Sequence, residues 1–296
     1  MKKYIAIDIG GTAIKYGIVS EAAEIEYKNS IKTEAWKGGP SILEKVIELV
    51  EQLCECISEK ISGLCISTAG MVDDKSGTIF YASQLIPNYI GTQFKKVLEE
   101  KFQIPCEVEN DVNCAGLAEY MSGAAQGCKV VTMLTIGTGI GGCLILDGKI
   151  FHGSSYSACE VGYMKIDNSD FQTLGAARIL TKNVAKEKGE SEDIWTGYKI
   201  FEEAKKGDMI CQKAIENMVD ILGKGIANIC YIINPGVVVL GGGIMAQEEY
   251  LNDMLQKAVK RYLLETIGDN TRIVFAKHKN DAGMLGAFYN FLQKRQ

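Results

Sequence analysis

The chain has 296 residues, of which 47% are hydrophobic and 23% charged, and a formal net charge of −5 at pH 7. This length exceeds what one ordinary hydrophobic core serves, so two lobes are expected. The acidic balance argues against a nucleic-acid partner, because binding a phosphate backbone needs a basic face. The first apolar run is interrupted at Asp8, which is too early for a signal peptide or a membrane span. A cytoplasmic protein with no membrane partner is therefore expected.

Two similar strand–turn–strand patterns lie about half a chain apart. The first is "YIAIDIGGTAIKYGIVS", in which a glycine pair turns the chain after Asp8. The second, from Thr132, is "TMLTIGTGIGGCLILDGKIFHG", with an Asp147-Gly148 hairpin turn. Thr135 follows Asp8 by 127 residues. This spacing predicts the internal duplication of an α/β unit that begins with a hairpin.

The remaining pattern alternates helices and strands. Between the hairpins it predicts a helix over 41–60, a strand over 63–70, a helix over 91–102, a strand over 106–110 and a helix from Asp111. After the second hairpin it predicts helices over 173–188, 196–206 and 208–230, a strand over 237–243, a helix over 247–264, a strand over 271–277 and a final helix from 281. This order indicates an α/β protein with a mixed sheet in each half.

Glycine-threonine turns end the buried strands of both hairpins. "GTGIGG" fits G-x-G-x-x-G, but hairpin sequence follows it where a dinucleotide fold needs a helix, so dinucleotide binding is rejected. Backbone amides and a threonine hydroxyl in such turns can hold phosphate oxygens. A buried Asp8 is costly unless it is hydrogen-bonded, paired or holding a cation. One such turn is equally compatible with a plain tight hairpin, whereas two equivalent turns favour a nucleoside triphosphate site.

Cysteines give little support for a metal site. The ten cysteines include no Cys-x2-Cys pair, and the chain has only two histidines, His152 and His278. Because the chain shows no secretory signal, the cysteines are expected to be reduced thiols.

Asp111 has a simple structural interpretation, because it follows a strand and opens a predicted helix, which is where an N-cap belongs.

As a set, these motifs are similar to those of the ROK family of sugar kinases and related repressors. The segments that carry the resemblance are "IAIDIGGTAIK", "PNYIGTQF", "IPCEVENDVNCAGLAE", "LTIGTGIGGCLILDGKIFHG", "EVGYM" and "INPGVVVLGGGI". The resemblance implies the duplicated actin-like (hexokinase and Hsp70-type, ribonuclease H-like) ATPase fold, with two lobes and a central cleft. The lobes would be residues 1–116 plus 281–296, and residues 117–280. Family members are commonly homodimers.

The resemblance also implies a role for each motif in ATP- and Mg²⁺-dependent sugar phosphorylation. Asp111 would be the general base, and Asp8 would hold Mg²⁺ through water or phosphate. The predicted sugar-binding residues are Gly70, Asn88, Asn110, Asp111, Glu160, Tyr163 and Gln172. ATP would lie against Asp8, Gly10, Gly11, Thr12, Lys15, Thr135, Gly137, Thr138, Gly139, Gly241, Gly242 and Gly243. Lys15 has an alternative, because its strand position could simply face solvent.

The stretch "SACEVGYMKIDNSDFQTLG" departs from the family pattern. Glu160 matches the family's first sugar-binding glutamate, but Tyr163 stands where many members have a zinc-binding histidine. The cysteine cluster that completes that zinc site is missing, so no zinc is expected, and Cys159 is interpreted as a packing residue. Gln172 falls where a second glutamate belongs, in an alignment that could slip by one residue across the shortened loop.

The departures bear on the substrate. An aromatic Tyr163 favours a sugar that is larger or less polar than glucose, and a β-glucoside or N-acetylmannosamine is the leading expectation for phosphorylation at a primary hydroxyl. A glucokinase or fructokinase, a non-catalytic sugar sensor, and another enzyme of the same fold are the alternatives. Asp111 separates the kinase from the sensor, and the set of Asn88, Asn110 and Glu160 separates it from the other enzymes.

Overall fold

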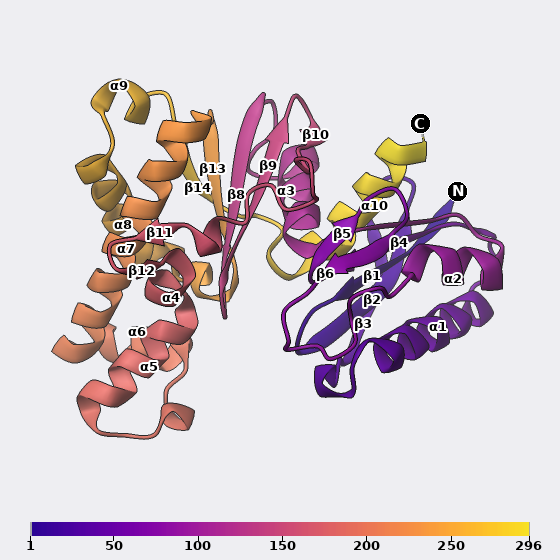
Figure 1. The fold of residues 1–296 in the computed structure, drawn as a ribbon, viewed down its shortest axis with the longest axis horizontal. Coiled ribbons are helices and arrows are strands. Elements are labelled where there is room, and N and C mark those ends of the chain that lie inside the picture. The colour runs from indigo at the N-terminus through magenta and orange to yellow at the C-terminus, as the bar shows by residue number, and fades with distance from the viewer. Residues whose placement is uncertain (1, 296) are drawn as a thin grey trace. The chain divides into compact units, whose positions relative to one another are not determined.

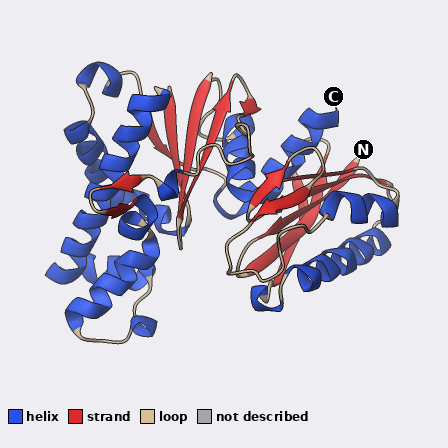
Figure 2. Cartoon of the chain, viewed as in Figure 1, coloured by secondary structure: helices blue, strands red, loops and turns tan. Residues whose placement is uncertain are grey.

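The computed structural model describes residues 2–295 and divides into two compact units, drawn as ribbons in Figures 1 and 2. Unit 1 comprises Met1–Ser122, His152–Ala158 and Asn280–Gln296, and unit 2 comprises Gly123–Phe151 and Cys159–Lys279. Unlike the lobes expected from the sequence, unit 1 keeps the whole helix that begins at Asp111 and takes in residues 152–158.

Unit 1 is built on a five-stranded sheet with the strand order β3-β2-β1-β4-β7. Its strands are β1 (Lys3–Ile9), β2 (Ala13–Ser20), β3 (Ile25–Lys32), β4 (Ile61–Thr68) and β7 (Cys106–Asn110). A small hairpin pairs β5 (Met71–Asp73) with β6 (Thr78–Tyr81). The helices are α1 (Gly39–Cys56), α2 (Phe94–Phe102), α3 (Asp111–Ser122) and α10 (Ala282–Arg295), and 3-10 turns cover Ala35–Lys37 and Lys279–Asp281.

The two faces of this sheet follow the two-residue period of its strands. Ile5, Ile7 and Ile9 point into a core that they share with the apolar sides of α1 and α2. The alternate residues face α10, where Tyr4 makes edge-to-face ring contacts with Phe288 and Phe291 at centroid distances of 5.0 and 5.6 Å. Asp8 therefore belongs to the face that α10 covers.

Unit 2 contains a second five-stranded sheet, with the order β10-β9-β8-β13-β14. Its strands are β8 (Val130–Ile136), β9 (Ile140–Leu146), β10 (Lys149–Ile150), β13 (Val237–Gly241) and β14 (Arg272–Phe275), and a small hairpin pairs β11 (Lys165–Ile166) with β12 (Ser169–Asp170). The helices are α4 (Phe171–Gly175), α5 (Ala177–Lys188), α6 (Gly197–Lys205), α7 (Met209–Ile233), α8 (Glu248–Tyr262) and α9 (Glu265–Gly268), with 3-10 turns over Val161–Tyr163, Glu192–Ile194 and Gly243–Gln247.

The two sheets have the same topology, which confirms the predicted duplication. In each, a hairpin of antiparallel strands is followed by two strands that extend the sheet in parallel. Asp8 pairs with Lys15 on β2 and Ser67 on β4. In unit 2 the matching residue is Thr135, which pairs with Gly141 on β9 and Gly241 on β13.

The hairpins β5–β6 and β11–β12 and the short helix α9 were not predicted, and two further features differ from the sequence-based expectations. The helix predicted over 173–188 is two helices, α4 and α5, because Ala176 is extended and the Ala177 N–H bonds to the Gly137 carbonyl at 2.9 Å. Strand β3 was not predicted: it is a mostly exposed edge strand, and the alternation of Ile25, Tyr27 and Ile31 in "IEYKNSIK" is interrupted by polar Asn29.

Candidate active site

The turn between β1 and β2 has the features expected of a phosphate-binding turn. The Gly10 N–H bonds to the Ala13 carbonyl at 3.0 Å, and the Gly10 carbonyl accepts from the Thr33 hydroxyl at 2.6 Å. Gly11 and Thr12 at the tip are exposed, and a Cβ on Gly11 would meet nothing within 4 Å. Hydrogen bonds thus hold the base of the turn, and its tip is accessible to a ligand.

Asp8 is held by contacts on both of its oxygens. Ser67 donates its hydroxyl to Oδ1 at 2.7 Å, and Lys15 Nζ lies 3.6 Å from Oδ2. The Lys15 ammonium also donates to the Asn280 carbonyl at 3.1 Å, so Lys15 does not simply face solvent. On the other side Gly283 of α10 comes so close that a Cβ there would lie 2.3 Å from the Asp8 carboxyl carbon.

The start of α3 assigns the capping role to Asn110. Its Oδ1 accepts from the N–H groups of Val112 and Asn113, at 2.9 and 3.0 Å. This is the side-chain pattern of a helix N-cap. The N-cap interpretation considered for Asp111 is therefore wrong. Asp111 instead occupies the first helical position and is half-buried. Its Oδ1 accepts from Asn110 Nδ2 at 3.0 Å and from the Val112 N–H at 2.9 Å.

The structure brings three of the predicted sugar-binding residues together. Besides Asp111, Asn110 Nδ2 also donates to the Gly70 carbonyl, at 2.9 Å. Gly70 has a φ of +98°, and a Cβ there would lie 2.8 Å from the Tyr81 carbonyl oxygen, so no larger residue fits without strain. Gly70, Asn110 and Asp111 thus form one cluster at the ends of β4 and β7.

Asn88 lies on a neighbouring exposed loop, with a left-handed φ of 53°. The next residue, Tyr89, is buried, and its hydroxyl is hydrogen-bonded to that of Thr68, the β4 residue paired with Asn110. Burial raises the pKa of the Tyr89 phenol, and the charge of Asp111 raises it further. Tyr89 therefore anchors the Asn88 loop near the Asp111 cluster.

A buried carboxylate that the sequence analysis overlooked precedes this cluster. Glu109 is 0% exposed and bonds to Asn113, to the Asn110 N–H and to His152. The available signal was the alternation in "CEVEN", which puts two glutamates on one side of a buried strand.

In unit 2 the corresponding turn packs against Gln172 of α4. Gly137 N–H bonds to the Gly139 carbonyl at 2.9 Å. Gln172 Oε1 lies 2.8 Å from where a Cβ on Gly139 would be and 3.2 Å from that of Gly162. Gln172 thus packs between the glycine turn and the loop of Glu160, while Thr138 is exposed at the tip and Thr135 is half-buried.

Glu160 and Tyr163 flank Gly162 in that loop, and both are exposed, Tyr163 by 54%. Partial desolvation raises the pKa of the Glu160 carboxyl although it remains open to solvent. Cys159 has a left-handed φ of 66° and packs on Gly142, and burial raises the pKa of its thiol to about 12, with a further contribution from the Glu160 charge.

The third glycine cluster lies beside the end of β8. Gly241 is buried in β13, and Gly242 has a φ of +99°, with its Cβ position 2.2 Å from the Ile136 carbonyl oxygen. Gly243 is exposed, and a Cβ there would meet nothing within 4 Å. Gly242 therefore brings the chain directly over the strand that leads into the Thr138 turn, within the same unit.

Residues 2–295 contain neither a cluster of metal ligands nor a helix that could span a membrane. No three His, Cys, Asp or Glu side chains gather there in a group that could hold a metal ion. All ten cysteines lie in this part of the chain and are free. None of its helices is both long and apolar enough to span a membrane.

Comparisons with known proteins all point to sugar kinases of one family. The ROK family model matches residues 4–294. A β-glucoside kinase of Listeria monocytogenes is 31% identical over 301 residues, covering 99% of this chain and 98% of that one. A solved structure from the same organism, of a proposed N-acetylmannosamine kinase, has a TM-score of 0.89 and 29% identity over 99% of this chain and 100% of that one. A Streptomyces griseus glucokinase, solved with glucose and AMPPNP, has a TM-score of 0.85 and 25% identity over 99% and 100%.

Proposed function

The chain belongs to the ROK family of carbohydrate kinases, with the actin-like ATPase fold, and from this we propose that it transfers the γ-phosphoryl group of ATP to the 6-hydroxyl of a hexose derivative. The observation that carries the proposal is that two neighbouring residues at the start of α3, Asn110 and Asp111, have different roles. Asn110 Oδ1 caps the helix, and Asn110 Nδ2 holds the Asp111 carboxylate and the Gly70 carbonyl. Asp111 Oδ1 also accepts from the Val112 N–H, so the carboxylate lies at the helix N-terminus. A kinase needs such a carboxylate to accept the proton of the attacking hydroxyl.

The other proposed roles follow the two units. In unit 1 the exposed turn of Gly10, Gly11 and Thr12, with Lys15, would hold ATP phosphates. In unit 2 the same role would fall to the turn over 135–139, and the Gly241–Gly243 cluster would lie against the nucleoside. Asn88, Asn110 and Glu160 would bind sugar hydroxyls. Glu160 accepts hydrogen bonds best when it is ionised. Because its pKa is raised, sugar binding should weaken at a higher pH than it would with a glutamate of ordinary pKa.

Asp8 is suited to bind a Mg²⁺ ion whose other ligands would be phosphate oxygens and water. Mg²⁺ keeps several waters in ATP sites and takes few protein carboxylates. Asp8 supplies one carboxylate, 13% exposed, next to the open turn. The ion would neutralise charge on the β- and γ-phosphates. Asp8 would orient it, and the Lys15 ammonium would add positive charge beside it.

We further propose that the acceptor is a β-glucoside or N-acetylmannosamine. The support is the exposed ring of Tyr163, three residues after Glu160, and the neutral Gln172 beside Gly162. A flat aromatic can stack on a sugar ring or an aglycone. A coupled assay with glucose, cellobiose, N-acetylmannosamine, N-acetylglucosamine, mannose and fructose ranks the candidates. A preference for fructose or glucose would refute the substrate assignment and leave the kinase assignment standing.

The catalytic assignment is tested with Asp111→Asn. General-base catalysis contributes about 10²–10⁴-fold, so we expect kcat to fall at least a hundredfold while calorimetry still detects sugar binding. Asp208→Asn is the matched control, because Asp208 is also an aspartate at a helix start, that of α7. Turnover of Asp111→Asn within tenfold of the unmodified protein would falsify the role of Asp111. We also expect elemental analysis to find no stoichiometric zinc.

A further inference from the structure

Strand β7 carries two buried glutamates on the same side. Cys106 and Val108 point into the core beneath α1 and α2, whereas Glu107 and Glu109 alternate with them and are 3% and 0% exposed. Buried carboxylates are costly unless they are paired and hydrogen-bonded. Each must therefore have a specific set of partners, and the two sets differ.

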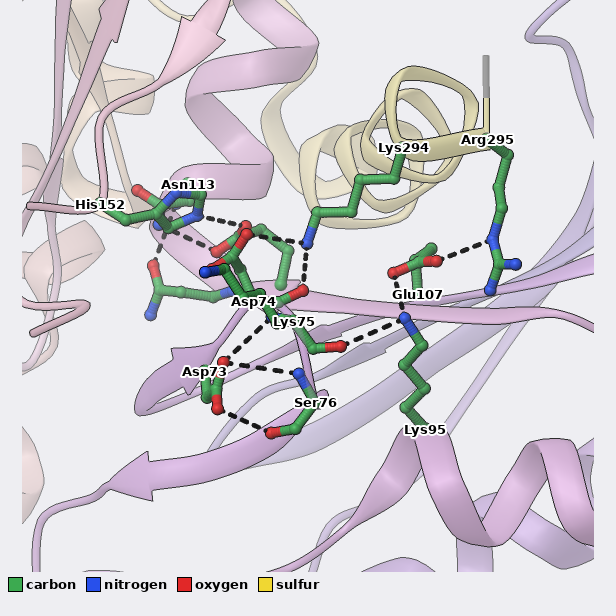
Figure 3. A network of polar contacts seen from close by, with 12 residues as sticks. Asp73, Asp74, Lys75, Ser76, Lys95, Glu107, Asn113, His152, Lys294 and Arg295 are labelled. Atoms are coloured by element: carbon green, nitrogen blue, oxygen red, sulfur yellow. Dashed lines mark hydrogen bonds and ion pairs between the residues drawn. The ribbon is translucent and has the colours of Figure 1, made fainter.

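Glu107 is paired with cations from two helices. Lys95 Nζ of α2 lies 2.9 Å from Glu107 Oε2, and Arg295 Nε of α10 lies 2.8 Å from Oε1. Figure 3 shows this group apart from His152 and Asn113. Its contacts tie three elements of unit 1 together and involve no residue of the Asp111 cluster.

Glu109 has partners of a different kind. Its Oε1 accepts from the Asn110 N–H at 2.8 Å and from Asn113 Nδ2 at 2.9 Å. Its Oε2 lies 2.8 Å from His152 Nε2. Glu109 thus fixes Asn110, directly before Asp111, and Asn113, two residues after it. It also fixes His152, the first residue of the segment 152–158, and Glu160 follows two residues after that segment.

We propose that Glu109 is a positioning residue for phosphoryl transfer, with one carboxylate oxygen setting Asn110 and Asn113 around Asp111 and the other fixing His152 at the base of the chain that leads to Glu160. The inference rests on the proposed function. Neither oxygen reaches the reacting atoms by this account: Glu109 acts through Asn110, which holds both Asp111 Oδ1 and the Gly70 carbonyl.

The charges around His152 favour its protonated form. Burial disfavours the imidazolium, but the hydrogen bond and charge of Glu109 outweigh this and, with Asp74, raise the His152 pKa, while Lys294 opposes them. A raised folded-state pKa means that the pair stabilises the protein fully below the ordinary histidine pKa. This stabilisation is lost as the pH rises through the folded-state value.

Kinetics of matched variants separate positioning from mere stability. We expect Glu109→Ala to lower kcat by about tenfold to a hundredfold, which is the factor obtained if the free energy of one hydrogen bond to a charged group is lost from the transition state. Glu109→Gln should restore part of the loss, because an amide oxygen still accepts from the Asn110 N–H. His152→Ala should raise the sugar KM more than it lowers kcat. His152→Gln should bring the sugar KM back towards the value of the unmodified protein. Glu107→Ala is the control: it also removes a buried carboxylate from β7 and should lower the melting temperature while kcat stays within twofold.

A titration tests the pair without any turnover. The chain has only two histidines, so NMR signals are assigned with a His278→Asn variant. We expect the His152 pKa to lie above that of free histidine and to fall in Glu109→Gln, because the charge that outweighs burial is then removed and only the weaker, opposing effects of Asp74 and Lys294 remain beside it. An unchanged His152 pKa in Glu109→Gln, or a kcat for Glu109→Ala no lower than that for Glu107→Ala, overturns the inference. Failure of the unmodified protein to phosphorylate any sugar overturns the proposed function instead.

Discussion

Gly286→Ala tests how α10 and α3 are packed. A Cβ on Gly286 would lie 1.8 Å from the Cys114 carbonyl oxygen of α3, about 1.6 Å short of the 3.4 Å of an ordinary contact. The new Cβ meets only backbone atoms of Cys114, so no side-chain rotation relieves the clash. Overpacking costs about 3 kcal/mol at the upper end of its usual range, and alanine returns about 1 kcal/mol of helix propensity. The net loss of about 2 kcal/mol corresponds to a melting temperature lower by about 4–8 °C.

A shift of α3 that relieves this clash should also affect the candidate active site. If α3 moves, Asp111 at its start moves with it, and a misplacement of about 1 Å can lower a rate about a hundredfold. Melting is followed by circular dichroism and kcat by the coupled assay. Gly197→Ala is the control, since its Cβ would meet only Ile244 Cδ1, at 3.9 Å. A Gly286→Ala protein that melts within 1 °C of the unmodified protein would refute this account of the packing.

Three further predictions concern single side chains. Gly283→Ala should push the Asp8 carboxylate off Ser67 and lower kcat/KM for ATP about tenfold or more, with little change in melting temperature because a side chain can yield; unchanged ATP kinetics would contradict this. Tyr163→Ala should raise the KM for a β-glucoside about two- to tenfold and leave that for glucose unchanged, and equal effects on both would argue against stacking. Asp208 caps α7, and Lys188 and the Cys211 N–H lower its pKa to about 2, so its stabilisation is present above its ordinary pKa of about 4 and is lost as the pH falls towards 2. Asp208→Ala should therefore lose about 1 kcal/mol at pH 7 in urea unfolding, with the difference from the unmodified protein disappearing near pH 2, and a loss independent of pH would exclude the ion pair as its source.

The duplicated architecture could be predicted because its signals are local. Each hairpin has a glycine turn between two apolar strands, and the sequence spacing of Asp8 and Thr135 is that of two structurally equivalent strand positions. Strand β3 was not predicted in this way, since it is a mostly exposed edge strand with few apolar residues, which pairs only with β2 in its sheet. The break between α4 and α5 depends on a hydrogen bond to Gly137, which lies 40 residues earlier in the chain.

The cluster of polar residues was predicted only in part. Asn110 and Asp111 were both recognised, but adjacent polar residues at a helix start are equally good caps by type, and only the geometry assigns the cap to Asn110. Glu109 was missed because its importance lies in His152, 43 residues away in the sequence. Burial of a charged residue depends on such distant partners, which a pattern along one strand does not contain.

The last helix also bears on the order in which the protein can fold during synthesis. α10 fills the second face of the unit 1 sheet, where the Phe291 ring occupies the space above Gly63, whose Cβ would lie 2.3 Å from it. Every residue of unit 2 precedes α10 in the chain. On a ribosome, unit 2 can therefore complete its core while the β1 to β7 sheet, translated first, still has one apolar face uncovered. The earliest strands of the chain would then be the last to be fully protected, and this is where a chaperone would have most to bind.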